Sequence, residues 1–201
     1  MENNLPTEAE IIALHKKHAP TEALFNASYS HCLAVWKIAE QLITSQNLNL
    51  DQELVKAACL LHDIGIYKLI QPTEPLNVGP AKRGIVAEQM LEEEGLPKAL
   101  RDIVAHHVGH NLTRERIEEG LLGVLPPRDL TPRTAEERLV NYVSKLHGRS
   151  ENPQFISVDA YRAFLKKIEE EYYVNDFESL VKEFGEPDLQ PLAKEFTEEL
   201  V

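Results

Sequence analysis

Two adjacent residues, His62 and Asp63, carry side chains of the kinds that commonly bind a divalent metal ion. They follow an apolar run, Ala57 to Leu61, that predicts a buried helix, so both side chains would lie where that helix ends. His31, on the preceding amphipathic segment, is a candidate third ligand. Each residue also has an ordinary structural alternative. A histidine is favoured at a helix C-terminus by the helix dipole, and a histidine at the edge of a core needs no metal.

The elements that must position these residues are helical, because the apolar periodicity is close to 3.6 residues along almost the whole chain. Thr7 with Glu10, and Thr134 with Glu137, each predict a capping box at a helix start. Expected helices run from Thr7 through Leu14, from between Pro20 and Ser28 to about Gln46, from Asp51 through Leu61, and over 81–94, 97–107, 134–146, 157–172, 176–184 and 188–200. No alternating strand, internal repeat or low-complexity segment is evident, so the sequence predicts an all-α fold.

Glycine and proline mark the breaks between these helices. Gly65 and Gly95 are expected to stop the helices before them, and Gly65 would do so by adopting a left-handed backbone. Segments 71–80 and 123–132 are expected to be irregular loops. Segment 148–153 is the one candidate boundary, and the helices after it are too few for a confident core of their own. We therefore expect a single domain over 1–201, with a core at about 20–148 and a C-terminal helical extension at about 153–201.

The composition narrows the function classes. The chain has 201 residues, with 33 Asp plus Glu against 21 Lys plus Arg, a formal charge of -12. This excess of acid argues against a protein that binds nucleic-acid duplexes through the phosphate backbone, but not against a small phosphorylated ligand. The two cysteines, Cys32 and Cys59, lie in apolar helical patterns and are expected to be buried and free. No signal-like segment or membrane span is evident, and we expect a soluble, cytoplasmic protein.

Several short motifs in order resemble the HD-domain metal-dependent phosphohydrolases, in the subset with the HDIG motif. The matching residues are His31 in Tyr-Ser-His-Cys-Leu-Ala-Val, His62 and Asp63 in Leu-Leu-His-Asp-Ile-Gly, and His106 in Ala-His-His-Val-Gly. The stretch Ala135 to Leu146 looks like the family's last helix, so the resemblance covers roughly Ser28 to Gly148. It implies an all-α HD-type helical bundle and a metal set of one His, an adjacent His-Asp pair and a distal Asp.

Two departures from the family pattern affect the expected metal site. The distal Asp of the family's Ala-Asp-Lys-Leu corresponds to Ser144, a neutral and weaker ligand. The extra histidine of the six-ligand subset corresponds to Pro80, which cannot ligate through its side chain. The resemblance therefore implies one divalent metal ion held by His31, His62 and Asp63, with Mn, Fe, Co, Ni, Zn and Mg not distinguished. Ser144, His107 and His110 would be weak ligands or neighbours of the ligands, and a surface cluster is the alternative for the two histidines.

The activity implied is hydrolysis of a phosphate ester of a small molecule, a nucleotide in particular, by a metal-activated water. Asp63 would orient that water, and His106 would act as a general acid or as a hydrogen-bond donor beside the metal ligands. The residues expected to face the substrate phosphate are Lys68, Lys82, Arg83 and Lys145, each of which could instead be a solvated helix residue. The alternative function is a catalytically degenerate HD module that binds a metal or a nucleotide in a regulatory role. The sequence leaves open whether the chain forms a homo-oligomer.

Overall fold

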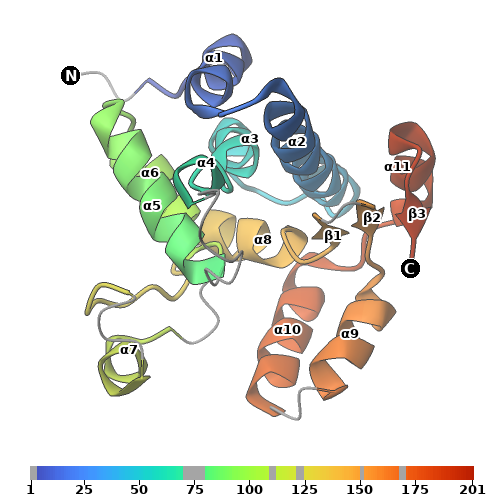
Figure 1. The fold of residues 1–201 in the computed structure, drawn as a ribbon. Coiled ribbons are helices and arrows are strands. Elements are labelled where there is room, and N and C mark those ends of the chain that lie inside the picture. Colours follow the sequence, from blue (N-terminus) through green and yellow to red (C-terminus); the bar gives the residue numbers. More distant parts are fainter. Residues whose placement is uncertain (1–3, 70–79, 109–111, 121–124, 150–151, 168–170) are drawn as a thin grey trace.

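The computed structural model describes residues 4–69, 80–108, 112–120, 125–149, 152–167 and 171–201. Within them the fold is all-α, as the sequence predicts, and helices form nearly all of the regular structure (Figure 1). The helices up to the end of the HD-like stretch are α1 (Glu8–His18), α2 (Glu22–Ser45), α3 (Gln52–Leu61), α4 (Ile66–Leu69), α5 (Pro80–Glu93), α6 (Lys98–His106), α7 (Arg114–Gly120) and α8 (Ala135–Val143). The expected loop at 71–80 falls almost wholly outside the described residues.

Helix α3 lies at the centre of the bundle and packs against α2, α6 and α8. Its last seven residues include six buried side chains, so it has almost no polar face, as expected for a helix enclosed by neighbours. Helix α2 buries one stripe, on which Cys32, Val35, Ala39 and Leu42 are inaccessible to solvent. Both cysteines are free and buried, as the sequence predicts. The end of α3 is thus held inside the bundle rather than at its surface.

The predicted helix bounds are wrong near the C-terminus, where the helices run over 158–167, 171–184 and 189–196 instead of 157–172, 176–184 and 188–200. The predicted caps can be compared one by one with the structure. Thr7 forms the full capping box with Glu10, and the Asp51 side chain caps α3. Thr134 caps α8 by accepting from the backbone N–H of Glu137. However, the Glu137 carboxylate does not return to Thr134, because it accepts from the Arg133 N–H and from the imidazole of His106 instead.

Gly65 has a different role from the one its position suggests. Gly95 ends its helix with φ +72°, as expected, whereas the backbone of Gly65 is not left-handed. A β-carbon at Gly65 would lie 2.3 Å from the carbonyl oxygen of Arg83 and 2.7 Å from the backbone nitrogen of Ala87. The glycine is needed because α5 passes directly over the turn that follows α3. This close approach brings Arg83 beside Asp63.

The described C-terminal residues form helices and a small sheet. The sequence predicts helices there, but its periodicity does not reveal the sheet. Its elements are β1 (His147–Gly148), β2 (Gln154–Phe155), α9 (Val158–Lys167), α10 (Glu171–Phe184), α11 (Leu189–Phe196) and β3 (Glu199–Leu200). β1 pairs antiparallel with β2, and β2 pairs parallel with β3. Strands of two residues are too short to show an alternating pattern.

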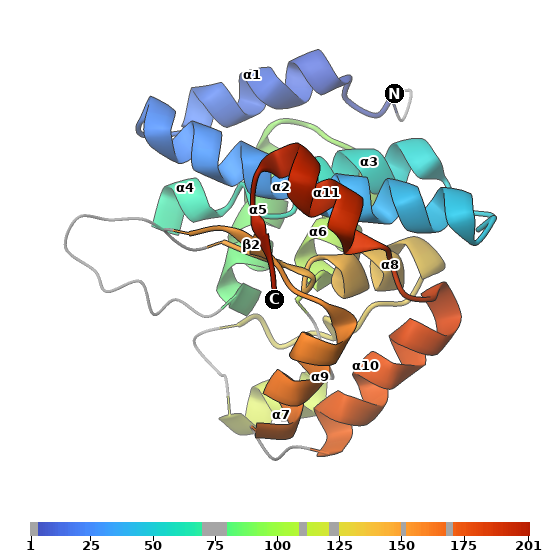
Figure 2. The ribbon, with the colours of Figure 1, turned by 90° about the vertical axis from the view of Figure 1, so that its right-hand side faces the viewer.

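The extension packs onto the bundle at two places. Helix α10 contacts α8, and α11 crosses over α2, as the second view shows (Figure 2). Buried side chains of the extension, Phe155 and Phe177 among them, belong to the same apolar cluster as those of α2 and α3. None of the helices in the described residues is both long and apolar enough to cross a membrane.

Candidate metal centre

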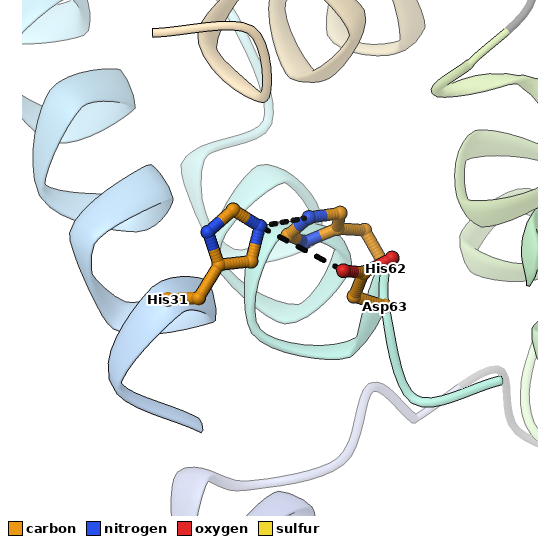
Figure 3. Close-up of side chains that lie close together, drawn as sticks. All are labelled: His31, His62 and Asp63. Atoms are coloured by element: carbon orange, nitrogen blue, oxygen red, sulfur yellow. Dashed lines mark hydrogen bonds and ion pairs between the residues drawn. The ribbon is translucent and has the colours of Figure 1, made fainter. Parts of the chain in front are cut away.

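Three predicted ligands, His31, His62 and Asp63, meet inside the bundle (Figure 3). His31 Nε2 lies 3.2 Å from His62 Nε2 and 3.8 Å from Asp63 Oδ2. One donor atom from each residue lies within 4.8 Å of the other two, and all three side chains are buried. Among the described residues no other group of this kind is found.

The packing of α2 against α3 explains this meeting. His31 precedes Cys32 on the buried stripe of α2, and His62 is the residue at which α3 ends. Figure 3 shows the His31 ring reaching from α2 toward the two side chains at the end of α3. The adjacent residues His62 and Asp63 therefore point into the bundle at the end of α3.

The histidines are in the state that metal binding requires. His62 Nδ1 lies 2.7 Å from the carbonyl oxygen of Cys59, so Nδ1 carries the proton and Nε2 keeps its lone pair. Burial lowers the pKa of His31 and of His62 below the usual histidine value, so both rings are neutral at pH 7. Two nitrogens bound about 2.1 Å from one tetrahedral ion would be separated by about 3.4 Å, close to the 3.2 Å between the two Nε2 atoms. The donor set thus fits a divalent cation.

Two arginines hold the carboxylate of Asp63. Arg149 Nη1 lies 2.9 Å and Arg83 Nη1 3.4 Å from Asp63 Oδ2, and only the Arg83 contact has hydrogen-bond geometry. Burial alone would raise the pKa of the Asp63 carboxyl, but the Arg149 and Arg83 guanidiniums outweigh it and hold that pKa below its usual value. Asp63 is therefore a carboxylate at any pH at which the protein would work. Sequence reasoning missed Arg149, whose only signal was its place directly after the HD-like stretch.

A cavity of about 450 Å³ opens beside these residues. Its wall contains the three candidate ligands, and Arg83, Ser144, Lys145 and Arg149 contribute polar groups from other elements. The Lys145 ammonium donates to Asn141, and burial lowers the pKa of this lysine to about 7. Ser144 donates its hydroxyl to the Asn141 carbonyl, 3.0 Å away. The further wall residues are His107, Val108, Leu112, His147, Tyr161 and Tyr173.

His106 and His107 lie in different surroundings, and of the two His107 lines the cavity. His106, predicted as the general acid, points away from the cavity and bonds through Nδ1 to Glu137 at 2.9 Å. His107 lines the cavity, with its ring 4.9 Å from the His62 ring. The side chains of consecutive helix residues point about 100° apart, so only one of the two histidines can face the candidate metal ligands. His107 donates Nδ1–H to Val104 O, and burial lowers its pKa to about 3, which leaves Nε2 unprotonated.

The other predicted phosphate-binding lysines do not reach this cavity. Lys68 is exposed and pairs with Glu93. Lys82 lines a separate groove beside Glu88 and Arg128. His110 lies outside the described residues. Of the predicted cations, Arg83 and Lys145 are the two that the structure brings to the metal cluster.

Two curated proteins are similar in sequence to part of this chain. An uncharacterized protein of Methanocaldococcus jannaschii is 35% identical over 119 residues, which are 58% of this chain and 63% of that protein. The tRNA (cytidine(56)-2'-O)-methyltransferase of Thermoplasma volcanium is 30% identical over 142 residues, which are 71% of this chain and 37% of the enzyme. The chain thus spans less than two thirds of the length of either relative.

A solved structure shares the fold. The HD domain of the L. monocytogenes phosphodiesterase PgpH superposes with a TM-score of 0.52 at 16% identity, covering 85% of this chain and 87% of that one. Residues 28–149 match the HD domain family, almost the range that the motifs span. This match covers more than half of the chain, and with the ordered histidine and aspartate motifs it shows that the chain belongs to the HD domain family.

Proposed function

We propose that the chain is a metal-dependent phosphohydrolase that holds one divalent ion on His31, His62 and Asp63. Its substrate is a phosphate ester of a small molecule, a nucleotide in particular. The observation that carries this proposal is that the three donors share one cavity with Arg83, Arg149 and Lys145. Metal donors and anion-binding cations side by side are what phosphoryl chemistry requires. That HD-domain relatives include a phosphodiesterase agrees with the same class of reaction.

The cations suit a phosphate group. Arg83 and Arg149 both approach Asp63 from the cavity wall, and the buried Nε of Arg83 has no hydrogen-bond partner. Guanidinium N–H groups of this kind bind phosphate oxygens, and Lys145 adds a third donor. A divalent ion bound at the cluster would supply a water of lowered pKa and would polarise a phosphoryl oxygen. Asp63, whose carboxylate lies near His31 and near both arginines, orients the attacking water.

The rest of the wall suits the organic part of the substrate. Tyr161 and Tyr173 line the cavity and offer aromatic surface for a nucleobase. His107, neutral with Nε2 unprotonated, can accept a hydrogen bond from the attacking water. We assign this contact to His107 and not to His106, because only His107 lines the cavity.

A direct test is hydrolysis of a panel of nucleoside mono-, di- and triphosphates by metal-stripped protein resupplied with Mn²⁺, Co²⁺, Ni²⁺, Fe²⁺, Zn²⁺ or Mg²⁺. We expect turnover with at least one ion and its loss in His62→Ala. His18→Ala is the matched control, because His18 pairs with Glu94 away from the cavity. Equal turnover by wild type and His62→Ala with every ion would overturn the proposal.

One observation favours the second candidate, a metal- or nucleotide-binding module without turnover. Ser144 lies in the cavity wall where the family pattern has a carboxylate, so the site lacks one negative ligand. Ser144→Asp restores that ligand. If the substitution creates hydrolysis that the wild type lacks, the natural chain is a binding module. If the wild type already turns over and Asp63→Ala abolishes it, the enzyme assignment stands.

A further inference from the structure

A line of three buried side chains runs from the C-terminal extension to the metal cluster. Glu198 Oε2 lies 2.7 Å from His147 Nε2, and His147 Nδ1 lies 2.8 Å from His31 Nδ1. The His147 side chain is 0% exposed and that of Glu198 only 9%. These contacts join residues that are 51 and 116 positions apart in the chain.

The chemistry of the three side chains fixes which atom donates and which accepts in each of these two contacts. A carboxylate only accepts, so His147 donates Nε2–H to Glu198. The neutral His147 ring then has a bare Nδ1, which accepts Nδ1–H from His31. With its proton on Nδ1, His31 keeps the lone pair of Nε2. That lone pair is the one that faces His62 and Asp63.

The small sheet holds the middle of this line. His147 stands in β1 opposite Phe155 of β2, whose ring meets the imidazole edge to face at 4.8 Å. β3 follows Glu198 directly, and the Val201 N–H donates to Phe155 O at 3.0 Å. The sheet thus brings the end of the chain beside the imidazole.

We propose that Glu198 and His147 are positioning residues that hold His31 as the Nδ1–H tautomer and so aim its Nε2 at the metal. This inference rests on the metal site of the proposed function, but it adds that the C-terminal extension helps to build that site. Partners of ligand histidines of this kind typically change metal affinity by about 10–100-fold when they are removed. The role of Glu198 is to orient, since it does not reach the cluster itself.

The first test needs no metal and no substrate. Long-range ¹H–¹⁵N spectra of the metal-free protein report which ring nitrogen of His31 carries the proton, with the signals assigned by a His31→Gln variant. We expect the Nδ1–H tautomer in the wild type. Glu198→Ala frees His147 to turn its proton toward His31, so His31 should shift toward Nε2–H. Glu198→Gln should restore the wild-type pattern, because its amide oxygen still accepts from His147 Nε2–H.

The second test is affinity for Mn²⁺ alone, measured by calorimetry on the full chain. We expect Glu198→Ala to weaken Mn²⁺ binding about tenfold or more and Glu198→Gln to stay within about threefold of wild type. Glu199→Ala is the matched control, since its side chain is exposed one residue further on. If Glu198→Ala does not fold, His147→Gln replaces it. The amide oxygen of that glutamine accepts from His31 Nδ1–H, and we expect the tautomer and the Mn²⁺ affinity to be retained.

The inference is overturned if wild-type His31 carries its proton on Nε2. It is also overturned if Glu198→Ala leaves both the tautomer and Mn²⁺ affinity unchanged, or if His147→Gln abolishes Mn²⁺ binding in a folded protein. Hydrolysis enters none of these readouts. An absence of turnover with the tautomer shift present would defeat the proposed function and leave the positioning role standing.

Discussion

His62 and His31, the two histidines among the three candidate metal ligands, are oriented by hydrogen bonds of opposite kinds. His62 donates Nδ1–H to the carbonyl of Cys59, three residues earlier in the same helix end. His31 depends on His147, which is 116 residues away and is itself bound by Glu198. One ligand is thus oriented by its own helix and the other by the far end of the chain. The comparison teaches that one ligand of the site is oriented locally and that the orientation of the other depends on the C-terminal extension.

Asp63 follows His62 directly in the chain, but distant arginines hold its carboxylate, so Asp63→Asn removes a ligand that both parts of the site share. The change removes the anionic ligand and leaves Arg83 and Arg149 facing a neutral amide. We expect Mn²⁺ binding to be lost and kcat/KM for the best substrate to fall about a thousandfold, or ~4 kcal/mol in transition-state stabilisation. Asp102→Asn, which removes an ion pair with Lys98 on the surface of α6, is the control. Retention of activity within tenfold would show that Asp63 is not a ligand.

Gly65→Ala tests the turn that follows His62 and Asp63. The new methyl group would meet the backbone of α5 at Arg83 and Ala87, which cannot move as a side chain could. We expect the free energy of unfolding to fall by about 3 kcal/mol, measured by urea denaturation. Gly120→Ala meets no atom within 4 Å and should leave stability nearly unchanged. Equal stabilities of the two variants would mean that α5 does not press on the turn.

The same division explains what the sequence could and could not predict. Most of the longer helices, the capping box at Thr7 and the meeting of His31 with the His62-Asp63 pair follow from local patterns and a familiar order of motifs. The short helices α4 and α7 and the start of α10 at Glu171 do not. The roles of Arg149 and Glu198 were not predicted, because no motif in the neighbouring sequence indicates them. Their partners are set by two-residue strands and by packing between distant helices, neither of which leaves a periodic signal.

His106 and His107 show that sequence prediction was limited even for two neighbouring residues at one helix end. The motif singles out the pair without saying which of the two faces the cavity, and the sequence assigned His106. In the structure His107 lines the cavity and His106 bonds to Glu137, and this difference is why we propose His107 for the catalytic contact.

Paired alanine substitutions sharpen that distinction. His106→Ala removes the imidazole partner of the buried Glu137 carboxylate and leaves its contact with the Arg133 N–H, so the free energy of unfolding should fall by about 2 kcal/mol while Mn²⁺ affinity is retained. His107→Ala should instead lower kcat/KM by about 10²-fold with a smaller loss of stability. Urea denaturation and steady-state kinetics on both variants check this. The reverse pattern would return the catalytic contact to His106.

The pH dependence of stability separates the core histidine from those of the site. Burial lowers the pKa of His15 to about 4, although its ring also bonds to Leu60 O and the Tyr67 hydroxyl. Because the unfolded chain protonates near pH 6.5 and the folded chain does not, the unfolded state binds more protons below that pH. His15 therefore makes the free energy of unfolding fall as pH drops from about 6.5 toward 4, by up to about 1.4 kcal/mol per pH unit. His15→Gln should flatten the measured slope by about one proton, with or without Mn²⁺, and an unchanged slope would contradict the burial argument.

The smallest expected effect concerns the turn that brings Glu198 to His147. Helix α11 ends at Thr197 with φ +58°, a left-handed conformation that a β-branched residue rarely adopts. The following N–H, that of Glu198, donates to Ala193 O at 2.9 Å, which turns the chain back toward β1. Thr197→Gly relieves the strain and should raise the free energy of unfolding by up to about 1 kcal/mol, with Mn²⁺ affinity unchanged. A gain in stability together with weaker Mn²⁺ binding would show that the threonine side chain, and not only the turn, helps to place Glu198. The backbone strain at Thr197 would then contribute to the orientation of His147 and His31.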